Sequence, residues 1–131
     1  MMKSVFGCVL LMLAACSPQE AAKTTTTRQV QLETFTLSYL PGDMPVETPL
    51  LLQLDSGNNQ VLAVTGTIRG KTMYMGEIPL RFELKQQQWQ AELMLGACTE
   101  PRMQWQLELE VRYQNGDKIT LQDSFYSRWP D

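Results

Sequence analysis

Apolar and polar residues alternate along most of this chain with a period of two, the spacing that sends successive side chains to opposite faces of a β-strand. The pattern begins over Phe35–Tyr39 and returns over Leu50–Leu54 and Val61–Ile68. Turn signals separate these segments: a proline-rich stretch over residues 41–49, and Ser56-Gly57-Asn58-Asn59. The pattern predicts short strands with one buried face each.

The second half of the chain continues in the same way. Met73–Met75 predicts a short strand, and Leu80, Phe82 and Leu84 are expected on one face of the next strand. The returning strand has Trp89, Ala91, Leu93 and Leu95 on its apolar face. The longest alternation runs from Met103 to Tyr113, and Asn115-Gly116 then predicts a hairpin that pairs it with Lys118–Tyr126.

No segment has a sustained helical period, so the chain is expected to be all-β. Seven or eight short strands at this spacing, each with one polar face, are typical of an immunoglobulin-like antiparallel β-sandwich. A small closed β-barrel is the alternative, because the number of strands does not distinguish the two architectures.

The first residues of the chain have the layout of a secretory signal. Lys3 is followed by a short apolar run that ends in Leu13-Ala14-Ala15-Cys16, and this run is too short to span a bilayer. The ending resembles a bacterial lipobox, which implies transfer of a diacylglyceryl group to the Cys16 thiol, cleavage before Cys16 and N-acylation, with palmitate among the chains. The alternative is an ordinary signal peptide with an incidental cysteine. By the same resemblance, Ser17 favours sorting to the outer membrane, facing the periplasm.

Three segments follow from this interpretation. Residues 1–15 are expected to form the lipoprotein signal peptide, residues 16–29 the lipidated cysteine with a flexible polar tether, and residues 30–131 one β-sandwich domain. Since no other stretch approaches the length of a membrane helix, the lipid is expected to be the contact with the membrane.

Composition argues against several classes of function. Loss of Lys3 with the signal leaves ten of the eleven cations against fourteen acids, a side-chain charge of −4 that disfavours nucleic acid as a partner. Histidine is absent, which removes the commonest general base and metal ligand. Glu108 and Glu110 share a strand face, but that face is polar and reads as a solvated surface. We therefore predict a protein that is not an enzyme.

The remaining chemistry is that of sulfur. Met73 and Met75, two apart on the expected strand, would point to one face about 6.7 Å apart at the backbone. In a meander of strands, Met75, Cys98 and Met103 are expected at one rim of the sandwich. Thioethers and a thiolate suit Cu(I), so these four residues are a candidate metal site. The alternative is that they fill the core, the commonest role of methionine and of free cysteine.

A family resemblance points the same way. The segment Thr48–Gly57, a following hairpin and Met73-x-Met75 look like the YtkA-like and CopC-like copper-associated periplasmic sandwiches. Of their Met-rich segment only Met73 and Met75 match, and the histidine that these families often use is missing. The resemblance implies a copper-associated envelope protein.

A second hypothesis is protein binding. Trp129, beside Arg128, lies beyond the last expected strand and could serve as a partner-binding anchor or fold back over the end of the sandwich. We therefore expect a membrane-anchored periplasmic lipoprotein with a non-enzymatic role in binding or assembly, with Cu(I) handling for a cuproprotein as its most concrete form. The alternative is an envelope scaffold that binds a partner protein and no metal.

Overall fold

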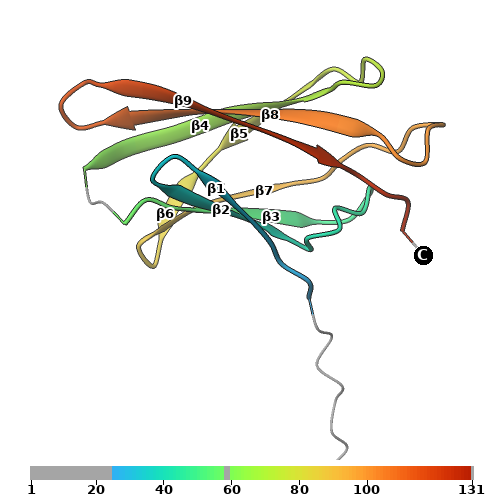
Figure 1. Ribbon diagram of the computed structural model, residues 1–131, viewed down its shortest axis with the longest axis horizontal. Helices are drawn as coiled ribbons and strands as arrows, with labels where there is room; N and C mark the ends of the chain where they lie inside the picture. The colour runs from blue at the N-terminus through green and yellow to red at the C-terminus, as the bar shows by residue number, and fades with distance from the viewer. Residues whose placement is uncertain (1–24, 58–59, 131) are drawn as a thin grey trace, which may run out of the picture.

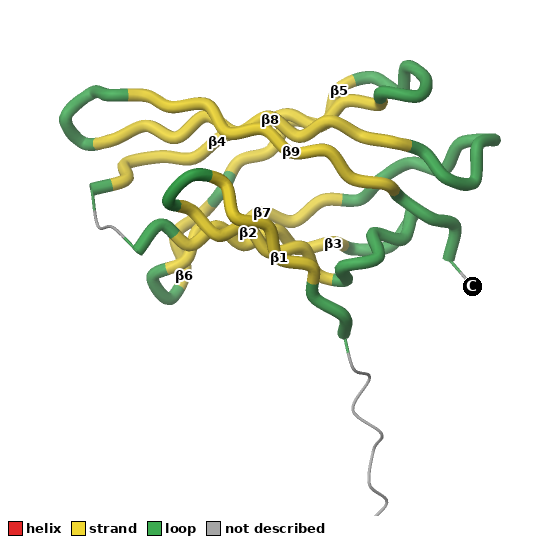
Figure 2. Tube along the Cα trace, viewed as in Figure 1, coloured by secondary structure: helices red, strands yellow, loops and turns green. Residues whose placement is uncertain are grey.

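Two antiparallel sheets packed face to face form the domain (Figure 1). The computed structural model describes residues 25–57 and 60–130, so the expected signal peptide, Cys16 and most of the expected tether lie outside the described residues. The described residues contain strands and loops without a helix, as Figure 2 shows.

The first sheet has the strand order β1-β2-β3-β7-β6 and the second has the order β5-β4-β8-β9. The strands are β1 (Arg28–Leu32), β2 (Phe35–Leu40), β3 (Leu50–Asp55), β4 (Val61–Gly70), β5 (Glu77–Arg81), β6 (Glu83–Lys85), β7 (Gln88–Leu93), β8 (Gln104–Tyr113) and β9 (Lys118–Tyr126).

This order is that of an immunoglobulin-like sandwich. The first sheet corresponds to strands A, B, E and D of that fold, with β1 and β2 sharing the place of A, and the second corresponds to strands C′, C, F and G. The chain changes sheets between β5 and β6, at Phe82. The predicted all-β sandwich is confirmed, and the sheets do not close into the alternative barrel.

Three local predictions were wrong. Met73–Met75 lies in the loop between β4 and β5 and forms no strand. Leu84 is exposed because the sheet change at Phe82 leaves it in a three-residue edge strand. The strand β1, which begins at Arg28, starts inside the stretch assigned to the tether. Its apolar positions are only half-buried, so they give a weak signal in the sequence.

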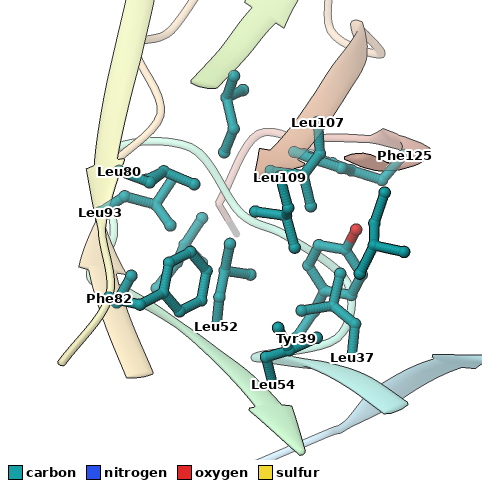
Figure 3. Close-up of a cluster of buried hydrophobic side chains, with 14 of the residues drawn as sticks. Leu37, Tyr39, Leu52, Leu54, Leu80, Phe82, Leu93, Leu107, Leu109 and Phe125 are labelled. Atoms are coloured by element: carbon teal, nitrogen blue, oxygen red, sulfur yellow. The ribbon is translucent and has the colours of Figure 1, made fainter. Parts of the chain in front are cut away.

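Alternation of apolar residues builds the core between the sheets. In β8, Trp105, Leu107, Leu109 and Val111 are all buried, with exposed or half-buried polar residues between them. Figure 3 shows Leu107, Leu109 and Phe125 of one sheet facing Leu37, Leu52 and Leu54 of the other. Trp89 and Trp105 are core residues, as the pattern predicts.

One buried hydroxyl joins the two sheets through a carboxylate. Tyr39 is fully buried on β2, its ring lies 5.4 Å from that of Phe125, and its hydroxyl donates a 2.5 Å hydrogen bond to Asp123 on β9. Arg28 of β1 reaches the same carboxylate at 3.4 Å. Burial, and then the hydrogen bond to Asp123, raise the pKa of Tyr39 far above its ordinary value. The tyrosine therefore stays protonated as long as the domain is folded.

This pKa shift predicts a loss of stability at alkaline pH. In the unfolded chain Tyr39 ionises near pH 10, but the folded state keeps its proton, so the free energy of unfolding falls as pH rises above about 10. We expect a steeper decline for the wild type than for Tyr39→Phe, by up to about 1.4 kcal/mol per pH unit. Urea denaturation between pH 8 and 11.5 measures both slopes.

At pH 7 the same variant loses the hydrogen bond to Asp123, and we expect a cost of about 1–2 kcal/mol. Tyr113→Phe, at a half-buried tyrosine near the end of β8, is the control. Parallel pH slopes for wild type and Tyr39→Phe would contradict the assignment of Tyr39 as the protonated link between the sheets.

Candidate functional site

The predicted site residues gather at one end of the sandwich. This end consists of the loops 41–49, 71–76 and 94–103 and the C-terminal segment 127–130, and we call it the entry end because the chain enters the first strand there. In Figure 1 these loops and the C-terminus lie together on the right. The turns 33–34, 86–87 and 114–117 lie at the opposite end.

Backbone hydrogen bonds tie the C-terminal segment to two of these loops. The Val46 amide donates to the Arg128 carbonyl at 2.9 Å, and the Arg128 amide donates to the Met44 carbonyl at 3.2 Å. The Ser127 amide donates to the Met103 carbonyl at 2.9 Å, and the Ser127 hydroxyl accepts the Trp105 indole N–H. Residues 127 and 128 therefore fasten the entry end across both sheets.

The candidate anchors Arg128 and Trp129 are held in place by this segment. The guanidinium of Arg128 pairs with Asp43 at 2.6 Å, at the surface. The indole N–H of Trp129 donates to the Cys98 carbonyl at 3.2 Å, while 47% of the residue stays exposed. Trp129 thus folds back onto the 94–103 loop and still presents much of its ring to solvent.

The four candidate sulfur residues all lie at the entry end but differ in exposure. Met103 is 2% exposed and belongs to the core, whereas Met73 is 42% exposed. Both Met103 and Met73 pack closely against Gly70: a Cβ at this position would lie 2.3 Å from the Met103 Cε and from the Met73 carbonyl oxygen. The absence of a side chain at residue 70 therefore lets Met103 pack beneath the loop that carries Met73.

Met75 and Cys98 are both half-buried and pack against the core. The Met75 Cε lies 3.5 Å from the Cβ position of Gly96, so this side chain reaches the loop that carries Cys98. The structure brings Met75 to the same loop as Cys98 and leaves Met73 accessible beside them. No group of three or more His, Cys, Asp or Glu residues that could hold a metal ion occurs within residues 25–57 and 60–130, so any site here would depend on thioethers.

The sequence pattern missed another property of this end. Seven large hydrophobic residues are exposed in the described part of the chain, and five belong to or flank the entry end: Met73, Tyr74, Met94, Tyr126 and Trp129. Tyr74 is the most exposed, at 86%. The sequence pattern placed Tyr74 within a short strand between Met73 and Met75, whereas the structure places it in a loop, where it projects into solvent.

No family model, curated protein or solved structure matches the chain. No helix long and apolar enough to cross a membrane is found in the part of the chain that the structure describes. The copper-family resemblance therefore remains a prediction from the sequence.

The packing at Gly70 gives a testable prediction. Gly70→Ala would force a methyl group against the Met73 carbonyl, a backbone atom that cannot move without shifting the loop, so we expect a loss of about 1–3 kcal/mol of stability. Gly96→Ala is the matched control, because its new methyl group would meet only Met75 Cε, at an ordinary contact distance. Urea denaturation of both variants measures the difference.

Equal stabilities for Gly70→Ala and Gly96→Ala would contradict the close packing of the 71–76 loop on Met103. A methyl group at residue 70 would meet two atoms, the Met103 Cε and the Met73 carbonyl oxygen. The double variant Gly70→Ala with Met103→Ala removes the first contact and keeps the second. We therefore expect it to be less stable than Met103→Ala alone.

Proposed function

We propose that this protein is a lipid-anchored, non-enzymatic binding or assembly protein of the bacterial envelope, attached through Cys16 and facing the periplasm. The motif Leu13-Ala14-Ala15-Cys16 supports the anchor, and Ser17 favours the outer membrane. The sandwich supports the binding role, because its exposed apolar residues concentrate at one ordered end. The loops of such a domain are where binding residues are commonly placed.

The most concrete form of this function is Cu(I) handling for a cuproprotein. Its main support is the contact of the Met75 Cε with Gly96, since this brings a thioether to the loop that carries Cys98. Met73, accessible on the neighbouring loop, is a third soft ligand. Met103 is buried in the core, so we propose that it supports the 71–76 loop from beneath and does not bind the metal itself.

The alternative is a scaffold that binds an envelope protein and no metal. The half-exposed indole of Trp129 favours it, since tryptophan held by a hydrogen bond is a typical interface anchor. Under this alternative the four sulfur-containing residues bind no metal and serve only in the packing of the domain.

The lipid anchor predicts the outcome of a simple replacement. Cys16→Ser removes the acceptor thiol, so the protein should lose incorporation of labelled palmitate and move from the membrane fraction to the soluble fraction. Cys8→Ser, within the expected signal peptide, is the matched control and should keep both properties. Palmitate labelling of the Cys16→Ser protein at the wild-type level would contradict the anchor.

Copper handling predicts one Cu(I) per chain in a competition titration against a chromophoric Cu(I) chelator. The mature lipidated protein, in detergent, is the sample. We expect Cys98→Ser and the pair Met73→Leu with Met75→Leu to weaken binding at least about tenfold, equivalent to about 1.4 kcal/mol. Met94→Leu, an exposed methionine just after β7, is the control and should bind as the wild type does. Equal binding by all variants, or none by the wild type, would favour the scaffold.

A further inference from the structure

We propose that the entry end lies against the surface of the bilayer that holds the lipid anchor, with Tyr74 and Trp129 in the headgroup region. This inference rests on the proposed anchor at Cys16 and specifies the membrane as a surface that the domain itself contacts. Three observations carry it: the side chains exposed at this end, the place where the chain enters, and the length of chain back to Cys16.

The exposed side chains are of the kind that prefers a membrane interface. Tyr74 is 86% exposed, Trp129 47% and Met73 42%, and they come from the 71–76 loop and the C-terminal segment, at the same end. Tyrosine and tryptophan have an apolar ring and a polar group, so they favour the boundary between acyl chains and water. Exposed residues of this size are otherwise few on the described surface, with Leu62 and Leu84 the two away from this end.

The chain enters the domain at this end in a fixed position. The Gly42 amide donates to the Thr26 carbonyl at 2.8 Å, and the approach is so close that a Cβ on Gly42 would lie 2.5 Å from the Arg28 amide nitrogen. Arg28 then pairs with Tyr39, next to the last residue of β2. Residues 26 and 27, directly before β1, are therefore held against the 41–49 loop, at the entry end.

The length of chain between Cys16 and Arg28 makes this end the one that meets the membrane. Twelve residue steps separate the two positions, spanning at most about 43 Å when fully extended and about 20 Å on average if flexible. The ten residues of β4 alone are about 33 Å long. The opposite end could reach the bilayer only if the tether ran back along the whole sandwich, close to its full extension.

The charges at the entry end indicate which interaction drives the contact. The four segments that define this end carry three cations and three acids: Lys71, Arg102, Arg128, Asp43, Glu47 and Glu100. These charges cancel, so attraction to anionic lipids contributes little and the contact depends on the aromatic and thioether side chains. Because the anchor keeps this end near the bilayer at high effective concentration, modest affinity for the interface is sufficient.

The test uses the mature lipidated protein in phosphatidylcholine vesicles, with or without bromine atoms near the glycerol end of the acyl chains. Bromine quenches tryptophan on contact, and Trp89 and Trp105 are buried, so Trp129 is the reporter. We expect a loss of up to about a third of the emission, the share of one tryptophan in three, with little dependence on salt. Trp129→Phe should show no quenching above background.

Paired variants test the loop. Replacing Met73 and Tyr74 by serine should reduce the quenching by about half. Leu84→Ser, at an apolar residue that is 58% exposed and lies away from the entry end, should leave the quenching unchanged. Protein that floats with the vesicles but is not quenched would overturn the docking and leave the anchor intact, whereas protein that does not float would overturn the anchor. Shielding of Trp129 that depends on protein concentration and not on bromine would overturn the proposal in favour of a second copy.

Discussion

The packing of two apolar sheet faces against each other is the interaction on which the rest of the structure depends. Each strand contributes alternate side chains, and residues such as Leu37, Leu52 and Leu107, which are completely buried, fill the core. Tyr39 adds a polar link across this core through Asp123. With the sheets fixed in this way, the loops at the entry end have a rigid base.

The sequence predicts the sheets better than the loops because period two reports burial between sheets directly. Wherever both faces of a strand have distinct surroundings, as in β8, the pattern is unambiguous. The same alternation over Met73–Met75 led to a wrong prediction of a strand. A short loop in which Met75 packs against the core and Met73 and Tyr74 are exposed has the same sequence pattern. Asp123 was missed because its partner is 84 residues away, on a strand whose neighbour in space no local pattern specifies.

The sequence predicted where the candidate site residues lie, but not which of their side chains are accessible to solvent. Met75, Cys98 and Met103 lie at one end, as expected, but the expected meander of strands was wrong, because β5 and β7 belong to different sheets. Which sulfur is accessible depends on Gly70, whose missing side chain admits Met103 to the core. The copper and membrane proposals use the same end of the domain, so a Cu(I) ion released there would be next to the bilayer and to any cuproprotein embedded in it.

The central claim is that the entry end is one ordered surface, fastened by the C-terminal segment. Hydrogen exchange of the backbone amides of Val46, Lys71, Ser127 and Arg128, which donate across its loops, tests this claim most directly. The account predicts protection close to that of the central strand β8. Exchange as fast as in the exposed turn at Gly57 would contradict it, because these loops would then move independently and would present no common surface to a metal, a partner or a membrane.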